Sequence, residues 1–589
     1  NDDDGKASLI LPCLYHHMRE MNDDEESDGK LSRNKNNKQD SDDGDGDNKN
    51  NNSEKSIKLS KFCVFELKRL LLDRAKSIDL IPEIQDNCAT DLAQFCSRGI
   101  TNNQKGEELR CLQASFKDLQ EDCQRAVANY TVEENKDIRL DQILMNACLP
   151  TIEEFCSDKR EEKGELLECL IRQKNNPKMQ FKCKIGIEHH QLLNLEDVSF
   201  NFKFKRACQS EINEHCTTQK SKLTVIHCLS ELVLNDTLLD QSQRVGDNCR
   251  QQLRFELFQL NENIQLDSEL FSACTNDLKK FCVKVQSGKG KLRECLKDNQ
   301  KSLSSECSKV LFKHEQINLV DQNADYNLQS KCKNSIQHFC HVDGDQDIIG
   351  CLRKHLLDPA LDSSCRMIVI NRIMLQNKDA RFNPSLWKSC SKDVNIHCRN
   401  ELNDLDLNDL NKMLEGRLLK CLKKKFVMDK LSKPCGNEVE QVMREAANVD
   451  YRLDPMLAEA CLNDIERLCA NDPNDKKEDC LRLKFQKGEI VPKTNCFEEV
   501  RRIIIEGAAD IFIDHELSQL CSNDLSRFCN DVPPGASQRM LLFFFNFHLL
   551  YVFIERKIFI MKKKFFIIFI LLKIKKILYV YVFLVTLRA

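Results

Sequence analysis

Apolar side chains recur along this chain at the spacing of amphipathic helices, and each recurrence is centred on a cysteine. An apolar residue stands four positions before that cysteine, at Ile84, Leu144, Phe204, Leu270, Leu328, Leu386, Leu457 and Leu517, and four positions after it, at Leu92, Ile152, Ile212, Leu278, Ile336, Val394, Ile465 and Leu525. A phenylalanine extends the stripe at Phe95, Phe155, Phe281, Phe339 and Phe528. Positions four apart share one helix face, so the pattern predicts amphipathic helices whose stripe is core.

Polar residues mark where several of these helices begin. Asp454-Pro455 is typical of an N-cap followed by a first-turn proline, and Asp141, Asp267 and Asp514 stand at the same offset. An aspartate at this position accepts hydrogen bonds from the free N–H groups of the first turn, and proline there loses no intrahelical bond. We therefore expect each opening helix to start about seven residues before its first cysteine.

The cysteines themselves form a repeating pattern. Of 32 cysteines, sixteen form eight Cys-x7-Cys pairs, at Cys88/Cys96, Cys148/Cys156, Cys208/Cys216, Cys274/Cys282, Cys332/Cys340, Cys390/Cys398, Cys461/Cys469 and Cys521/Cys529. In seven units a third cysteine follows and precedes a leucine, at Cys111, Cys169, Cys228, Cys295, Cys351, Cys421 and Cys480, and a fourth closes the unit at Cys123, Cys183, Cys249, Cys307, Cys365, Cys435 and Cys496. The step to the next unit is 25 residues, with one step of 26. Such a period indicates a repeat array.

We therefore predict an all-α fold, a tandem array of disulfide-stapled helical repeats of about 60 residues. The units are a partial repeat at 1–63, complete repeats 1 to 7 at 88–123, 148–183, 208–249, 274–307, 332–365, 390–435 and 461–496, and a truncated repeat 8 at 521–539. The incomplete units leave Cys13, Cys63, Cys521 and Cys529 without partners. Because Asn1 is also not an initiator methionine, we expect the chain to be a fragment.

Helix geometry restricts how four cysteines pair. Two cysteines eight positions apart on one helix are separated by roughly 12 Å, beyond the ~7 Å Cα limit of a disulfide. If the segment from the third to the fourth cysteine is a helix that runs back antiparallel, the second cysteine meets the third and the first meets the fourth. This nested arrangement is our prediction, and the crossed arrangement is the alternative. The constant step to the next unit predicts a further helix that packs neighbouring units together.

Composition points to an oxidising compartment. Many cysteines without a CxxC pair favour structural disulfides, and their wide spacing argues against zinc. A net charge of -4 argues against nucleic-acid binding. The sequons at Asn51, Asn129 and Asn235 predict glycosylation. We expect no cofactor and no enzyme activity, since nucleophile, phosphate-loop and zinc-protease motifs are missing and His189-His190 is isolated beside an apolar helix.

Two segments depart from the repeat composition. Residues 20–60 are mostly Asp, Asn, Lys, Ser and Gly, which predicts a disordered acidic insertion. Within it Asp40 to Asp47 faintly resembles a calcium loop, although a solvated spacer is the simpler interpretation. The apolar, lysine-rich tail at 540–589 interrupts repeat 8, and its longest uncharged stretch is 15 residues, shorter than a membrane span needs. We favour translated non-coding sequence there, with an unusual membrane anchor as the alternative.

The pattern L-x3-C-x3-[ILV]-x2-[FHL]-C, then Cys-Leu, then a cysteine 25 residues before the next unit, resembles the Golgi apparatus protein 1 family, also called E-selectin ligand 1 or cysteine-rich fibroblast growth factor receptor. The resemblance covers about 13–530. It implies a Golgi membrane glycoprotein with luminal repeats that binds fibroblast growth factors or selectin-like, cell-surface glycoprotein partners and affects their secretory traffic. The membrane segment would be missing or corrupted in this chain. A purely structural spacer or adhesion protein without growth-factor binding is the alternative, and an enzyme is disfavoured.

Overall fold

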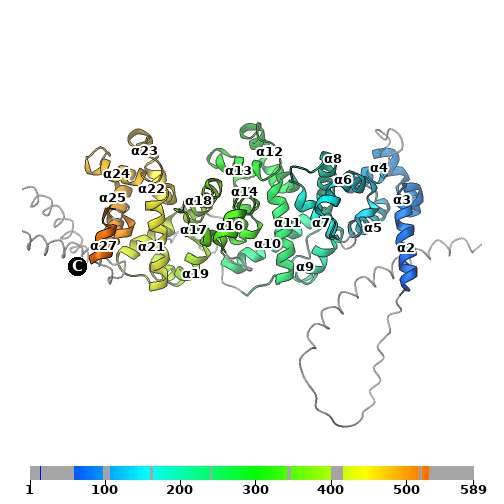
Figure 1. The fold of residues 1–589 in the computed structure, drawn as a ribbon, viewed down its shortest axis with the longest axis horizontal. Coiled ribbons are helices and arrows are strands. Elements are labelled where there is room, and N and C mark those ends of the chain that lie inside the picture. Colours follow the sequence, from blue (N-terminus) through cyan, green and yellow to red (C-terminus); the bar gives the residue numbers. More distant parts are fainter. Residues whose placement is uncertain are drawn as a thin grey trace, which may run out of the picture. The chain divides into compact units, whose positions relative to one another are not determined.

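The computed structural model describes residues 14, 59–96, 106–159, 164–238, 242–340, 347–399, 416–514, 517 and 520–528 (Figure 1). They fall into two compact units, Asn1–Val233 with Gln243–Leu303 and Leu234–Ser242 with Ser304–Ala589. The secondary structure of the described residues is helical, which confirms the all-α prediction. Several predictions concern residues outside the described part of the chain. These are the predictions for Cys13, most of the insertion at 20–60 with Asp40 to Asp47 and Asn51, Cys529 and the tail at 540–589.

Each repeat begins with an opening helix that carries the first cysteine. These helices are α3 (Pro82–Asp91), α6 (Gln142–Phe155), α9 (Phe202–His215), α12 (Ser268–Phe281), α15 (Tyr326–Lys331) with α16 (Lys333–Phe339), α19 (Pro384–Asp393), α22 (Pro455–Ala460) with α23 (Leu462–Leu468), and α27 (Ser522–Phe528). In repeats 1 and 6 the helix continues as a π-helical turn, η3 (Leu92–Cys96) or η11 (Val394–Cys398). The predicted periodicity therefore identified the elements, and in repeats 5 and 7 the opening helix is broken at its first cysteine, Cys332 or Cys461.

A second helix carries the third cysteine. These helices are α4 (Glu107–Ala114), α7 (Glu165–Gln173), α10 (Lys222–Leu238), α13 (Lys291–Asp298), α17 (Ile348–Arg353), α20 (Arg417–Val427) and α24 (Lys477–Gln486). Four of them start at a left-handed glycine, at Gly106 with φ of 92° and at Gly164, Gly290 and Gly416 with φ of 70°, 67° and 78°. The last three of these glycines share one further contact. In each case the glycine N–H donates to the carbonyl of the last residue of the preceding fourth-cysteine helix, at 3.3, 2.8 and 2.6 Å. Glycine adopts this conformation without a side-chain penalty, so it joins consecutive repeats here.

The fourth cysteine lies in the first turn of a third helix. These helices are α2 (Lys61–Arg74), α5 (Glu121–Lys136), α8 (Phe181–Asn194), α11 (Asp247–Glu262), α14 (Ser305–Val320), α18 (Ser363–Lys378), α21 (Lys433–Asn448) and α25 (Asn495–Ala509). The prediction of one helix from the third to the fourth cysteine is therefore wrong, because a turn separates the two. The fourth cysteine instead begins the helix that fills the constant step.

A short 3-10 turn connects each of these helices to the next opening helix. The turns are η2 (Ile78–Leu80), η5 (Ile138–Leu140), η6 (Val198–Phe200), η7 (Ile264–Leu266), η9 (Gln322–Ala324), η10 (Ala380–Phe382), η13 (Tyr451–Leu453) and η14 (Ile511–Ile513). A helix of 14–16 residues followed by a turn of one type explains why the step hardly varies.

The described disulfides have the nested arrangement. The first cysteine pairs with the fourth across Cα distances of 4.6–4.8 Å, at Cys88–Cys123, Cys148–Cys183, Cys208–Cys249, Cys332–Cys365, Cys390–Cys435 and Cys461–Cys496. The second pairs with the third across 5.9–6.1 Å, at Cys96–Cys111, Cys156–Cys169, Cys216–Cys228, Cys282–Cys295, Cys340–Cys351, Cys398–Cys421 and Cys469–Cys480. Cys274 and Cys307 are also disulfide-bonded. Cys63 and Cys521 are free, as expected for incomplete units.

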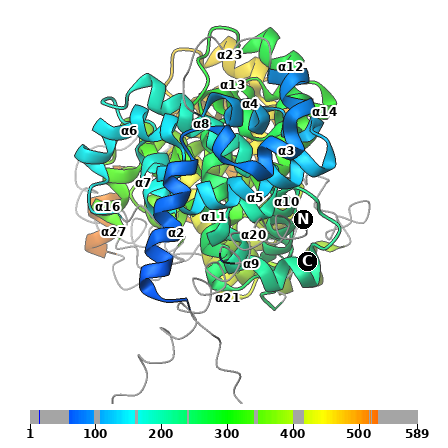
Figure 2. The ribbon, with the colours of Figure 1, turned by 90° about the vertical axis from the view of Figure 1, so that its right-hand side faces the viewer.

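The core of each repeat surrounds its outer disulfide. The apolar residue four positions before the first cysteine is 0–1% exposed in repeats 1 to 7, which confirms the stripe. The phenylalanine before the second cysteine is only partly buried at Phe95, Phe155 and Phe339, and Phe528 is 46% exposed. Because the helical run ends close to this residue, its ring covers the edge of the core. Figure 1 and Figure 2 show α6, α7 and α8 of repeat 2 packed side by side around one such core.

Candidate functional site

Buried charges collect at the joints between repeats, where a 3-10 turn leads into the next opening helix. Two Asp or Asn residues bracket most of these turns, as Asp137/Asp141, Asp197/Asn201, Asn263/Asp267, Asp321/Asp325, Asp379/Asn383, Asp450/Asp454 and Asp510/Asp514. The second residue caps the opening helix, as predicted for Asp141, Asp267 and Asp454. Its side chain is thereby held inside the joint, where Asp454 is 3% exposed.

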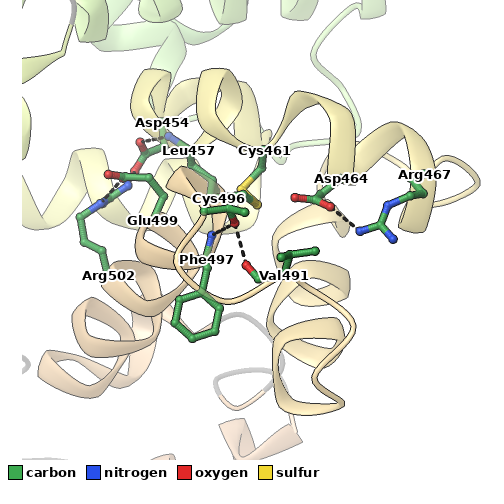
Figure 3. Close-up of a disulfide and its surroundings, with 11 residues drawn as sticks. Asp454, Leu457, Cys461, Asp464, Arg467, Val491, Cys496, Phe497, Glu499 and Arg502 are labelled. Carbon is green, nitrogen blue, oxygen red and sulfur yellow. Dashed lines mark hydrogen bonds and ion pairs between the residues drawn. A yellow bond between two sulfur atoms is a disulfide. The ribbon is translucent and has the colours of Figure 1, made fainter.

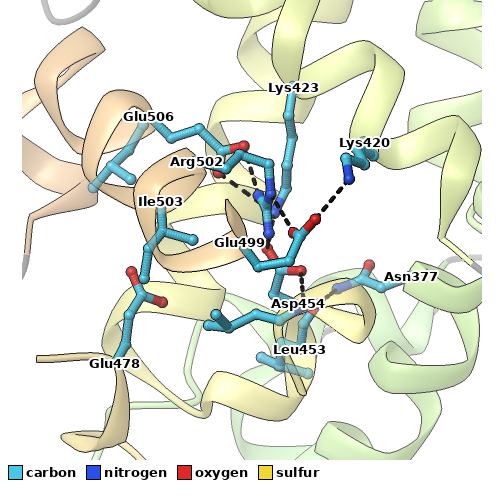
Figure 4. Close-up of polar contacts among 12 residues, drawn as sticks. Asn377, Lys420, Lys423, Leu453, Asp454, Glu478, Glu499, Arg502, Ile503 and Glu506 are labelled. Carbon is cyan, nitrogen blue, oxygen red and sulfur yellow. Dashed lines mark hydrogen bonds and ion pairs between the residues drawn. The ribbon is translucent and has the colours of Figure 1, made fainter. Parts of the chain in front are cut away.

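In the joint between repeats 6 and 7, one carboxylate connects three helices (Figure 4). Asp454 accepts a hydrogen bond from the Leu457 N–H at 3.1 Å and so caps α22. The same side chain also pairs with Lys423 of α20 at 2.6 Å and with Arg502 of α25 at 2.8 Å. Lys423 belongs to repeat 6 and Arg502 to repeat 7. The cap therefore serves as the ionic link between the two repeats.

Further ion pairs surround this link. Arg502 pairs with Glu499 at 2.7 Å and with Glu506 at 2.6 Å, both on its own helix. Lys420 of α20 reaches Glu499 at 2.6 Å, again across the joint. Lys420, 43% exposed, lies at the edge of the cluster, whereas Glu506 is 6% exposed. Three cations thus face three carboxylates, and pairing of this kind is what makes buried charge tolerable.

The electrostatics follow from burial and pairing. Burial alone would raise the pKa of Asp454, but Arg502 and Lys423 outweigh it and hold that pKa well below its usual range. Burial raises the pKa of the nearby Glu478, with Arg482 opposing it. The charges of the Asp454 cluster are paired with one another, so the arrangement holds helices together and does not present charge to a ligand.

The outer disulfide of repeat 7 joins the same pair of helices (Figure 3). Cys461–Cys496 connects the end of α22 to the start of α25, and Asp454–Arg502 connects the start of α22 to the middle of α25. The pair is therefore fixed covalently at one level and ionically at another. Arg467, whose side chain is 54% exposed, makes an ordinary surface ion pair with Asp464 in the same repeat.

The joint between repeats 1 and 2 is built around a histidine. His190 of α8 is 1% exposed, and its Nε2 lies 2.7 Å from Asp141 Oδ2. Its Nδ1 lies 3.1 Å from Asn135 Oδ1. The Asn135 amide nitrogen donates to Asn194 Oδ1 at 2.7 Å and to the Phe200 carbonyl at 3.0 Å, which identifies its oxygen as the acceptor. Both ring nitrogens thus face acceptors, which favours the imidazolium form.

Other ionisable groups lie around this histidine. Burial would lower the pKa of His190, but the hydrogen bond and charge of Asp141 raise it above 6.5. Burial, with the charge of Asp141, raises the pKa of Glu134 to about 7, although it accepts from Gln113 at 2.6 Å. Arg110 pairs with Asp141 at 3.2 Å. Burial lowers the pKa of the neighbouring His189 to about 4, so that ring is neutral. The prediction that His189-His190 is isolated is wrong, because His190 bonds to Asp141. The sequence did not reveal this contact, since the two residues are 49 positions apart.

We expect this joint to be more stable at acidic than at mildly alkaline pH. Folding raises the pKa of His190, so its stabilisation is complete below pH 6.5 and is lost as the pH rises through the raised value. Glu134 acts in the same direction. Its raised pKa stabilises the folded state fully below pH 4.5, and this contribution is lost as the pH rises to about 7. Hydrogen exchange in α5 and α8, corrected for intrinsic rates, should report a loss on the order of 1–3 kcal/mol between pH 5.5 and pH 8.

Repeat 5 provides the internal control for this prediction. Arg372 stands at the position of His190, seven residues after the fourth cysteine, and pairs with Asp325 at 2.6 Å. Arginine does not titrate in this range, so exchange in α18 should hardly change. His190→Gln should reduce the pH dependence in α8. Equal responses in α8 and α18 would contradict the assignment.

The structure also places the other predicted site residues. Asn129 is exposed on α5, and Asn235 is half-buried on α10; their glycosylation stays a prediction. Cys469, Asp472 and Cys480 lie within 4.8 Å of one another, but the two sulfurs form a disulfide and are not free to bind a metal. A cavity of about 40 Å³ beside Lys222 and Glu256 has room for a water molecule and not for an organic ligand.

The family model described as a cysteine rich repeat matches residues 61–120, 121–178, 182–237, 247–304, 305–360, 363–429, 433–489 and 494–541. Golgi apparatus protein 1 of Gallus gallus is 37% identical over 496 residues, which are 83% of this chain and 43% of the relative. The chain belongs to the Golgi apparatus protein 1 family. The Homo sapiens protein is 36% identical, covering 83% of this chain and 41% of the relative, and the Caenorhabditis elegans homolog is 31% identical, covering 82% and 44%.

Membership of the Golgi apparatus protein 1 family confirms the resemblance inferred from the cysteine spacing. The chain spans less than half the length of these relatives. No solved structure matches it. In the part of the chain that the structure describes, no helix is both long enough and apolar enough to cross a bilayer.

Proposed function

We propose that this chain is a luminal part of a Golgi membrane glycoprotein that binds growth factors of the fibroblast growth factor type, or selectin-like partners, and affects their secretory traffic. The observation that carries the proposal is the match to Golgi apparatus protein 1 relatives across 83% of the chain. Its relation to the family extends over consecutive repeats and not over one isolated module.

Two features of the structure support a luminal binding protein. The nested disulfides require an oxidising compartment, which the lumen of the secretory pathway provides. The buried charges of the joints described above are paired internally, so ligands would meet the exposed helix faces. These faces differ between repeats, so repeats with the same fold could present different surfaces to different ligands.

Direct binding tests the proposal. The chain, made in a secretory host and immobilised, should bind a soluble fibroblast growth factor or a selectin ectodomain saturably. Reduction and alkylation should abolish this binding, since opened disulfides unfold the repeats.

The alternative function is a disulfide-rich spacer. It predicts no saturable binding of either probe to the oxidised chain. Binding that persists unchanged after reduction and alkylation would also contradict the proposal, because it would not depend on the repeat fold.

A further inference from the structure

Helix α8 of repeat 2 carries an exposed apolar stripe. The side chains of Phe181, Ile185 and Leu192 are 76%, 48% and 48% exposed. Their spacing places them, with Glu188, within an arc of about 60° on the helix surface. The stripe is about 16 Å long, or three helical turns.

The stripe faces solvent because the opposite side of α8 is fixed in the core. Cys183 and Ile187 are 0% exposed on that side, and Cys183 is bonded to Cys148 of α6. His190, on the same buried side, is held by Asp141 as described above. A helix tied at two levels does not rotate its outer face inward, so the exposure of the stripe is a fixed property of the repeat.

Packing of the repeat does not require apolar residues at the positions of Phe181 and Ile185. The residues two before, two after and nine after the fourth cysteine are Glu121, Arg125 and Val132 in repeat 1, Asp247, Gln251 and Phe258 in repeat 3, Ser305, Lys309 and Gln316 in repeat 4, Ser363, Met367 and Met374 in repeat 5, Lys433, Asn437 and Arg444 in repeat 6, and Thr494, Glu498 and Ile505 in repeat 7. The first position is polar in all six and the second in five, whereas the third, that of Leu192, is apolar in four. The fold tolerates polar residues at the first two positions, so Phe181 and Ile185 have another use.

The charges beside the stripe indicate what covers it. Lys182 is exposed next to Phe181, and Lys178 lies just before the helix, where it pairs with Glu154. Lys184, on the other flank, lies 4.0 Å from Glu188, a weak and partly exposed ion pair. Lysines therefore exceed carboxylates around the Phe181 end. An apolar surface with a basic rim is complementary to an apolar surface with an acidic rim.

Two other occupants fit less well. A second copy of α8 would bring two basic rims together, and like charges in contact cost affinity. A bilayer would have to accept the carboxylate of Glu188, which lies within the stripe, into hydrocarbon, and that is costly.

We propose that the α8 stripe is a docking surface for a protein segment that presents apolar side chains flanked by Asp or Glu, such as one face of an acidic amphipathic helix. This inference rests on the proposed function in that both assign a protein ligand to the array. It does not depend on which growth factor or selectin-like partner binds.

A defined peptide tests the docking surface in the full chain. The probe is a fluorescein-labelled amphipathic helix of about 18 residues, with leucines on one face and glutamates beside them. Fluorescence anisotropy should show saturable binding, and Phe181→Ser with Ile185→Ser should weaken it at least about tenfold, because the two are apolar anchors of the stripe. Met367→Ser, at the position of Ile185 in repeat 5, is the matched control and should leave binding unchanged.

Charge reversal distinguishes docking at this surface from non-specific hydrophobic binding. Lys182→Glu should weaken binding of the glutamate peptide and strengthen binding of a peptide that has lysines in place of the glutamates. Three results would each overturn the proposal. The double variant could bind the glutamate peptide as tightly as the wild type, the wild type could prefer the lysine peptide, or the wild type could bind phosphatidylserine vesicles more tightly than the glutamate peptide. Failure of growth-factor binding with intact peptide binding would contradict the proposed function alone.

Discussion

Replacing Asp454 with alanine should be among the most damaging single changes in the described part of the chain. It leaves Lys423 and Arg502 without the carboxylate that lies 2.6 and 2.8 Å from them. Breaking a buried ion pair from one side typically costs about 3–5 kcal/mol, because the remaining charge stays buried and uncompensated. We expect this loss to open the joint between repeats 6 and 7 locally.

Native-state hydrogen exchange of α20 and α25 measures this effect, since a repeat array does not unfold as one two-state unit. Asp454→Asn separates the two roles of the residue. Asparagine caps a helix about as well as aspartate, and Asn201 and Asn383 occupy this position naturally. The asparagine variant should therefore keep the cap and lose only the charge.

The control for this experiment is Asp464→Ala. Asp464 pairs with Arg467, whose side chain is 54% exposed, so its removal should change stability by no more than about 0.5 kcal/mol. If Asp454→Ala and Asp464→Ala lower protection equally, the buried cluster does not hold the joint.

Removing the outer disulfide of repeat 7 should cost more than removing the inner one. Cys461–Cys496 closes 35 residues and Cys469–Cys480 closes 11. The loss of chain-entropy restriction alone corresponds to about 4 kcal/mol for the longer loop and about 3 kcal/mol for the shorter. The outer pair is also buried deeper, with Cys461 0% and Cys496 2% exposed, so serine there adds a polar group to the core.

The measurement is resistance of repeat 7 to proteolysis and hydrogen exchange in the two double Cys→Ser variants, made in an oxidising host. The outer variant should lose protection in both α22 and α25. The inner variant should lose it mainly around α24. A larger loss in the inner variant would show that the covalent link between α22 and α25 is not the main constraint on the repeat.

These expectations share one physical basis. The disulfides close each repeat, and at the joint between repeats 6 and 7 the capping carboxylate of Asp454 connects one repeat to the next. Repeats 2, 5 and 7 use different partners for the capping carboxylate, namely His190, Arg372 and Arg502. These three joints consequently share a geometry and differ in their response to pH, and of the three the His190 joint is the one expected to respond.

The sequence by itself determined the helices, the repeat unit and the caps. Apolar spacing and Asp454-Pro455 are local signals, because each depends on residues within one or two helical turns. The regular cysteine step is a longer pattern that can be read from the sequence because it repeats. The spacing of eight residues excluded a bond between the first and second cysteines of a unit, because they lie too far apart on one helix. The choice of the nested over the crossed pairing was decided by the tertiary structure. One element was misplaced, because a helix was predicted from the third to the fourth cysteine and the structure instead begins a new helix at the fourth. A turn sets the start of that helix, and the cysteine spacing did not reveal the turn.

The tertiary structure alone decided which charges meet and which apolar residues remain exposed. Asp141 and His190 are 49 residues apart, and Asp454 and Arg502 are 48 apart. Phe181, Ile185 and Leu192 have the spacing of a core stripe, yet they face solvent. Contacts of this kind depend on which helix packs against which and on how each helix is rotated, and the Cys148–Cys183 bridge with the His190–Asp141 pair sets that rotation for α8.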